Sequence, residues 1–196
     1  MEEVVGERFH GAEWGGRDLA GQHFTDCSFE GADLEELVTS GCVFTTCDFS
    51  SARLNASSHT DTAFLRCTFR RTNLFAARLV GCKLSGSTFV DCTMRPLEVD
   101  GGDWRYVSLR GADLGRTDLR GLKLAEADLT DADLRRADLR EADLSHARMR
   151  HVRLAGADLR GAELEGVDLR ILDLTGVRID ALQAVAVATA HGARVG

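Results

Sequence analysis

The chain has 196 residues, of which 44% are hydrophobic and 28% charged, which suits one folded domain. Its net charge of −7 argues against direct binding to nucleic acid, because that function needs a basic surface. The first residues lack the basic and apolar regions of a secretory signal, and no apolar run reaches the length of a membrane span, so we expect a cytoplasmic protein without membrane contact.

A period of five residues extends from Val4 to Ile179. Apolar residues occupy 34 of the 36 positions whose numbers end in 4 or 9, and the two exceptions are Thr39 and His59. An amphipathic helix or strand would instead give a period of 3.6 or 2. Repeats this short cannot bury an apolar face alone and must stack on one another, which predicts a solenoid over residues 1–179.

The positions beside each apolar centre are selective as well. Two residues before a centre the chain places twelve alanines and all six of its cysteines, so small side chains are expected to face the interior there. Fifteen of the 20 glycines lie two residues after a centre, where we expect tight corners. Because every cysteine obeys the repeat, we interpret them as small buried residues, with a metal or redox ladder as the alternative.

Phenylalanine indicates how many sides each coil has. Eight of the nine phenylalanines occupy centres and form two series with a spacing of 20 residues. The series are Phe9, Phe29, Phe49, Phe69 and Phe89, and Phe24, Phe44 and Phe64. Four five-residue units per turn predict an all-β fold, a right-handed quadrilateral parallel β-helix. About nine coils at ~4.8 Å spacing would give a rod roughly 40 Å long.

Two stretches of the solenoid are expected to be irregular. Thr39 and His59 are successive centres on one side, so a bulge is predicted within residues 37–60. Pro96 lies in residues 94–105, and proline removes a ladder donor and fixes φ, which predicts a kink or an irregular turn.

Residues 180–196 form a separate C-terminal segment. Asp180 is suited to cap the N-terminus of a helix over residues 181–191, and Gly192 to follow its end. The helix is apolar on most of its surface and is expected to be buried, either over the exposed edge of the last coil or between two rods. An end-to-end homodimer is the hypothesis. Its candidate interface residues are Ile179, Leu182, Val185, Ala186, Val187 and Thr189.

Motifs of catalysis, of nucleotide binding and of metal binding are absent from the sequence, so no enzyme activity, cofactor or metal is predicted. Negative charge gathers on two adjacent sides of the predicted coil. One side carries the column Asp118, Asp138 and Asp158, and the other carries Asp103, Asp143 and Glu163. Alternating acidic and basic columns also occur on surfaces that serve only solubility.

The repeated A-D-L-x-x units of residues 127–147 resemble those of the pentapeptide repeat proteins. Two further stretches, Cys92–Leu97 and Gln183–Gly192, resemble the fluoroquinolone-resistance members of that family. The resemblance implies an elongated homodimer joined through its C-terminal segments. It also implies a rod that mimics duplex DNA, binds DNA gyrase in place of DNA, inhibits supercoiling and relieves quinolone poisoning.

If this resemblance extends to binding, the acidic residues of the two sides are the candidate contacts for the basic DNA-binding groove of gyrase. They are Asp118, Asp138, Asp158, Asp143, Glu163 and Asp103. Two alternatives stay open: a self-immunity factor that protects gyrase from a natural-product toxin, and a structural or scaffolding repeat protein without a topoisomerase role.

Overall fold

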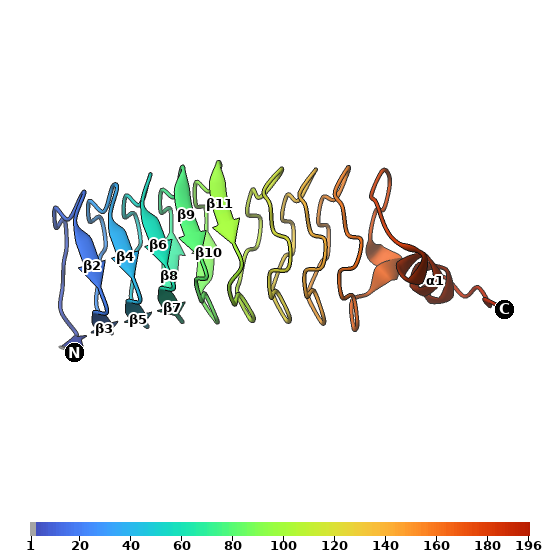
Figure 1. Cartoon of the computed structure of the whole chain (residues 1–196), viewed down its shortest axis with the longest axis horizontal. Coiled ribbons are helices and arrows are strands. Elements are labelled where there is room, and N and C mark those ends of the chain that lie inside the picture. The colour runs from blue at the N-terminus through green and yellow to red at the C-terminus, as the bar shows by residue number, and fades with distance from the viewer. Residues whose placement is uncertain (1–2) are drawn as a thin grey trace.

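Consecutive coils of the chain stack into a rod in the computed structural model, which describes residues 3–196 (Figure 1). Paired residues run parallel and lie 20 positions apart along the rod, from Glu3 with His23 to Asp158 with Arg178. This confirms a mostly β, parallel solenoid with a short C-terminal helix. The right-handed sense and the number of coils stay predictions, and the first two residues of the predicted solenoid lie outside the described residues.

Short strands form three parallel sheets in the part of the rod that ends at Asp100. The first sheet contains β1 (Glu3–Val5), β3 (His23–Thr25), β5 (Val43–Thr45) and β7 (Ala63–Leu65). The second contains β2 (Asp18–Ala20), β4 (Val38–Ser40), β6 (Ser58–Thr60), β9 (Ala77–Val80) and β11 (Leu97–Asp100). The third pairs β8 (Thr68–Arg70) with β10 (Thr88–Val90). In the described residues after Asp100, neighbouring coils pair through isolated bridges.

We name the four sides of the coil by one apolar centre each, which recurs every 20 residues. Face A contains Phe24, face B Phe29, face C Leu34 and face D Thr39. The predicted aromatic stacks are confirmed on faces A and B. Ring centroids of Phe24 and Phe44 are 5.0 Å apart with planes 5° from parallel, and those of Phe29 and Phe49 are 4.9 Å apart.

The cysteines fill the interior beside these rings, as predicted from their place in the repeat. All six are free thiols, and five of them are buried. The Cys47 thiol donates to the carbonyl oxygen of Phe24 in the preceding coil, at 3.5 Å. Ser87 and Thr72 occupy equivalent positions and donate in the same way, so a hydroxyl or thiol at this position finds an acceptor in the preceding coil.

The corners of the coil have the left-handed backbone that the glycine pattern predicted. Gly111 and Gly121 have φ values of 65° and 62°. Residues such as Arg116 and Arg136 occupy the same conformation at other corners, with φ values of 62° and 59°. Glycine is favoured there because a side chain crowds the backbone in this region.

The bulge predicted for residues 37–60 is wrong, because β4 and β6 pair in unbroken register with Thr39 opposite His59. Buried polar groups satisfy one another at this site. Thr39 Oγ1 lies 2.7 Å from His59 Nδ1 and 2.7 Å from Thr62 Oγ1, and His59 Nε2 lies 2.9 Å from Ser57 Oγ. Since Ser57 donates its own proton to a backbone carbonyl, it accepts from His59 Nε2, and Nδ1 then accepts from Thr39.

The stretch 94–105 contains a cis peptide bond between Arg95 and Pro96 and two glycines at positive φ. The coil nevertheless keeps its register, because Leu97 of β11 pairs with Ala77 of β9. The irregular features therefore lie in the turns on either side of β11, and the stacking of the coils continues across them.

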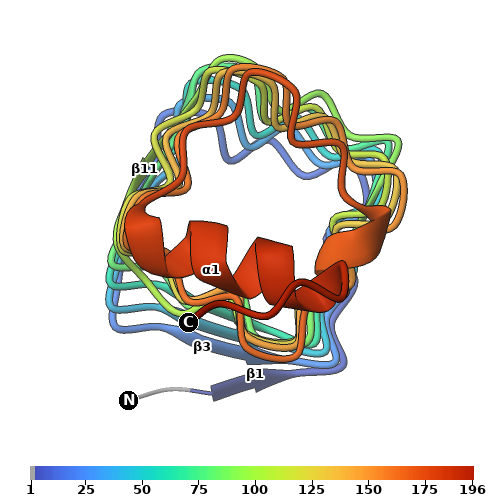
Figure 2. The same ribbon diagram turned by 90° about the vertical axis from the view of Figure 1, so that its right-hand side faces the viewer.

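A helix closes the C-terminal end of the rod. Helix α1 (Ala181–Ala190) lies across the opening of the last coils, after the short 3₁₀-helix η1 (Leu169–Ile171) (Figure 2). Asp180 caps α1 as predicted, and Gln183 closes a capping box with it. The described part of the chain contains no helix with the length and apolar character that crossing a bilayer requires.

The side chain of Gln183 continues the hydrogen bonding of the coils. Its Nε2 donates to the carbonyl oxygens of Leu159 at 2.6 Å and Ala162 at 2.9 Å. One coil earlier, the backbone N–H of Glu163 donates to Ala142 O, an offset of 21 residues that would pair residue 183 with Ala162. The amide of one side chain thus takes the place of a further coil.

Candidate partner-binding surface

The acidic column predicted on face D is assembled by the fold. Asp118 bridges to Asp138 and Asp138 to Asp158, so the three residues lie on successive coils. Each of these aspartates directly precedes a buried leucine centre. Because successive side chains point to opposite sides of an extended backbone, the aspartate side chain points outward. Asp also suits this position because its carboxylate accepts the backbone N–H two residues later, a local turn that closes the corner.

An arginine neutralises each carboxylate of this column. Asp158 Oδ1 accepts from the backbone N–H of Arg160 at 3.2 Å and from its Nε at 2.9 Å, and Oδ2 accepts from Nη2 at 2.7 Å. Asp118 and Asp138 make the same contacts with the arginines two residues after them. We call this Asp-Leu-Arg arrangement the clasp.

The carboxylates of the clasps become more buried toward the C-terminal end of the column, while the guanidinium groups face solvent. The side chains of Asp118, Asp138 and Asp158 are 50%, 28% and 12% exposed, and that of Arg160 is 49% exposed. Hydrogen bonds from the partner arginines lower the pKa of all three carboxyls, to about 2 for Asp158. At neutral pH face D therefore presents a column of ion pairs.

Face A combines one clasp with open carboxylates. Asp103 Oδ2 lies 2.6 Å from Arg105 Nη2, and this hydrogen bond lowers the pKa of Asp103. Lys123 lies between Asp103 and Asp143 in the ladder of bridges, so the structure does not place these two acids side by side. Asp143 instead bridges to Glu163 in the next coil.

Asp143, Glu163 and two neighbouring acids have no ion-pair partner within residues 3–196. We call these four residues the open acidic cluster. They are Glu141, Asp143, Glu163 and Glu165. Asp143 and Glu163 were predicted from the sequence as contacts, and Glu165 follows the next apolar centre, Leu164, on the same face. Glu141 was missed, although its number places it at the corner between faces D and A, the two sides with the most negative charge.

The predicted dimer residues divide into two groups on and beside α1. Leu182 and Val185 are 83% and 43% exposed, and the exposed Ala186 and Thr189 complete one stripe at helical spacing. Ile179 and Val187 are half-buried, and Ile179 packs against the core of the last coils. A single chain thus leaves an apolar stripe of α1 uncovered, and burial of that stripe between two rods stays a prediction.

Comparison with known proteins identifies the repeat. The sequence profile of the pentapeptide repeat region matches residues 42–119, and that of pentapeptide repeats in eight copies matches residues 105–140 and 137–176. The chain belongs to the pentapeptide repeat family. Together the matched residues run from 42 to 176 and include coils from both the strand-paired and the bridge-paired parts of the rod.

Individual pentapeptide repeat proteins are similar over part or all of the chain. The protein MfpA of Mycobacterium tuberculosis is 45% identical over 98 residues, a match that spans 47% of this chain and 54% of MfpA. Two trypsin-treated forms of QnrB1, a plasmid-mediated fluoroquinolone resistance protein, superpose with TM-scores of 0.87 and 0.86 at 23% and 25% identity. Each superposition covers 99% of this chain and 97% of QnrB1, so the two proteins share the whole architecture.

Proposed function

We propose that this pentapeptide repeat protein is a cytoplasmic DNA mimic that binds DNA gyrase, inhibits supercoiling and protects the enzyme from fluoroquinolones or other gyrase poisons. The observation that carries the proposal is the 45% identity to MfpA over 98 residues. The superposition on QnrB1, a fluoroquinolone resistance protein, over 99% of the chain supports it. The protein acts by binding rather than by catalysis.

Charge density limits which part of the rod imitates DNA. Duplex DNA carries about one charge per 1.7 Å, so a rod of roughly 40 Å would need about 24 charges, against a net charge of −7. The open acidic cluster is denser than the average surface. Its four carboxylates lie within two coils, or about 10 Å, where DNA would carry about six charges. Mimicry is therefore local, and the cluster is its strongest part.

The remaining predicted contacts have a different role in this proposal. The carboxylates of Asp118, Asp138, Asp158 and Asp103 are already bonded to arginines, so a basic groove would compete with those arginines for them. In this proposal the clasped residues contribute to the width and flatness of the binding surface. The open acidic cluster supplies the charge that steers and orients the encounter with gyrase.

A supercoiling titration with a charge-matched control tests the proposal. The test variant carries Glu141→Gln, Asp143→Asn, Glu163→Gln and Glu165→Gln. The control neutralises four acids of the N-terminal coils that have no ion pair within residues 3–196, namely Glu7, Glu13, Glu35 and Glu36. We expect the test variant to need at least about tenfold more protein for half-inhibition, and the control less than about threefold.

Each outcome of this titration is decisive for one part of the proposal. Full inhibition by the test variant would contradict the role of the open acidic cluster. Absence of inhibition by the unaltered protein, with no gyrase binding that duplex DNA competes away, would contradict the function itself. Repeating the assay with a fluoroquinolone present separates inhibition from protection.

We further propose that two chains form a homodimer through the exposed stripe of α1. Leu182→Glu would place a charge on the stripe, and sedimentation is expected to show a monomer at micromolar concentration. Ala184→Glu is the matched control, because Ala184 is exposed on the same helix but lies off the stripe. A monomeric unaltered protein, or equal effects of both substitutions, would contradict the proposal.

A further inference from the structure

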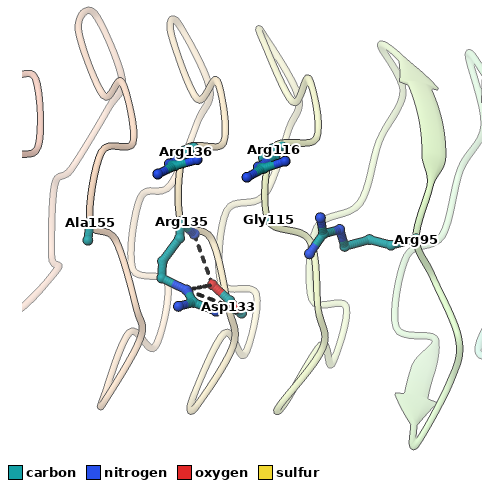
Figure 3. A pocket seen from close by; sticks show the side chains of 7 residues that line it. All are labelled: Arg95, Gly115, Arg116, Asp133, Arg135, Arg136 and Ala155. Atoms are coloured by element: carbon teal, nitrogen blue, oxygen red, sulfur yellow. Dashed lines mark hydrogen bonds and ion pairs between the residues drawn. The ribbon is translucent and has the colours of Figure 1, made fainter.

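A hollow of about 470 Å³ lies on face C, on the opposite side of the coil from face A and its open acidic cluster. Arginines form most of its wall (Figure 3). The hollow is lined by the four arginines Arg95, Arg116, Arg135 and Arg136, together with Asp133, Gly115 and Ala155. Four arginines thus line one hollow in a protein whose net charge is −7.

The hollow exists because two small residues flank a large one. Gly115, Arg135 and Ala155 occupy the same position in three successive coils. Gly115 has no side chain, and a Cβ built there would lie 3.4 Å from Nη1 of Arg95. Arg95 thus reaches over Gly115 into space that a side chain there would fill, and Ala155 presents only a methyl group on the other side. The Arg135 side chain is 53% exposed and can be reached from solvent.

Carboxylates beneath the hollow hold two of its arginines in place. Asp133, whose side chain is 3% exposed, lies with Oδ2 2.6 Å from Arg135 Nη2 and 3.2 Å from Nη2 of Arg153. Arg95 Nη1 donates to both oxygens of Asp113, at 3.0 and 3.1 Å. These pairs fix the guanidinium groups before any ligand arrives, which lowers the entropy lost on binding.

Arg116 and Arg136 lie at equivalent corners of adjacent coils, and neither forms an ion pair within residues 3–196. Figure 3 shows their side chains side by side along the edge of the hollow. Like charges at a spacing of roughly 4.8 Å repel one another. An anion in the hollow would relieve this repulsion.

The charges of the site indicate the kind of anion. Arg95, Arg116, Arg135, Arg136 and Arg153 contribute five positive charges. Asp113 and Asp133 remove two of them, which leaves three. A single carboxylate would neutralise only one, whereas a chain of phosphate groups carries several charges in a small volume. A guanidinium group also binds phosphate by donating two parallel, charge-assisted hydrogen bonds to two of its oxygens.

We propose that the arginine-lined hollow on face C binds a di- or triphosphate group. The group belongs either to a nucleoside triphosphate or to an inorganic phosphate chain. This site is separate from the proposed gyrase-binding surface and does not depend on that function.

Calorimetric titration with inorganic tripolyphosphate at low salt tests the site. The test variant is Arg116→Gln with Arg136→Gln. The control is Arg66→Gln with Arg71→Gln, which removes the same charge at two other corners with φ values of 53°, away from the hollow. We expect the test variant to bind at least tenfold more weakly than the unaltered protein, and the control to change affinity less than twofold.

Equal weakening in both double variants, or no saturable binding by the unaltered protein up to millimolar tripolyphosphate, would overturn the proposal. So would calorimetric binding of polyglutamate as tight as that of tripolyphosphate, because that outcome indicates an acidic peptide. Titration with ATP identifies the source, since tighter binding of ATP than of tripolyphosphate indicates a nucleotide and weaker binding an inorganic chain. Circular dichroism of each variant verifies that the fold is intact.

Discussion

The two ends of the solenoid keep one register but hold their coils together differently. Up to Asp100 the coils pair through strands of three or four residues as well as isolated bridges, and stacked phenylalanines fill much of the interior. After Asp100 they pair through isolated bridges, leucine and alanine fill the interior, and clasps cover the surface. The same backbone repeat can thus be stabilised mainly by packing inside the coil, or by packing together with ion pairs on its surface.

Face D shows the same contrast within a single column of centres. In the N-terminal part, Thr39 and His59 are buried and bonded to each other. In the C-terminal part, Leu119, Leu139 and Leu159 occupy the equivalent sites. A polar pair is tolerated at these centres because each group finds a partner, so the interior does not have to be apolar throughout.

The largest expected effect is the loss of one interior ring. Phe44→Ala should lower the free energy of unfolding by about 4 kcal/mol, because rings on both sides at 5.0 Å leave a cavity that cannot collapse. Leu144→Ala, on the same face five coils later, should lower it by about 3 kcal/mol. Denaturant unfolding of both variants measures the difference. An equal or larger loss for Leu144→Ala would contradict the contrast in packing.

Lowering the pH should reduce the free energy of unfolding through His59 in the N-terminal part and through Asp158 in the C-terminal part, over different pH ranges. Burial lowers the pKa of His59 from 6.5 to about 4. The unfolded chain therefore takes up this proton first, and stability is lost as pH falls from 6.5 toward 4, by about 3 kcal/mol. The pKa of Asp158 is lowered to about 2, so its contribution is lost only as pH falls from about 4 toward 2.

Thermal unfolding across this pH range measures the effect, with His59→Leu as the control. Leucine suits this column because Leu79 pairs with His59 in a neighbouring coil. Ser57 and Thr39 keep other hydrogen-bond partners in the variant. His59→Leu should show a flatter profile between pH 6.5 and 4. The same slope in both proteins would exclude His59 as the cause.

The smallest expected effect concerns the clasps. Asp133→Asn should lower stability by about 1 kcal/mol, because the 3% exposed carboxylate bonds to both Arg135 and Arg153. Asp118→Asn, at a 50% exposed clasp, should change it by less than about 0.5 kcal/mol. Chemical unfolding at low salt compares the two. A larger loss at Asp118 would show that burial does not set the strength of a clasp.

Much of this architecture follows from the sequence, because a period of five with phenylalanines 20 residues apart permits few arrangements. The helix after Asp180 was predicted because capping depends on local residues. The unbroken register at Thr39 and His59 was not predicted. It depends on hydrogen bonds to Thr62 and Ser57, which a hydrophobicity pattern does not contain.

The surface was harder to predict than the interior. Summed charges identified the two acidic faces, but they could not tell which carboxylates would be clasped. That depends on the rotamer of an arginine two residues later, as the 12% exposure of the Asp158 side chain shows. The arginine-lined hollow was not recognised either, because it requires Gly115 and Ala155 to fall on either side of Arg135 in successive coils.

The amide of Gln183, which bonds to Leu159 and Ala162, also bears on how such rods change length during evolution. The terminating helix needs only two carbonyl oxygens in one coil, and every regular coil offers the same pair. Duplication or deletion of a 20-residue unit upstream would therefore leave the terminator intact. It would shift the distance between the proposed functional surfaces in steps of about 4.8 Å. The length of partner surface that the rod can contact would therefore change in evolution by whole coils.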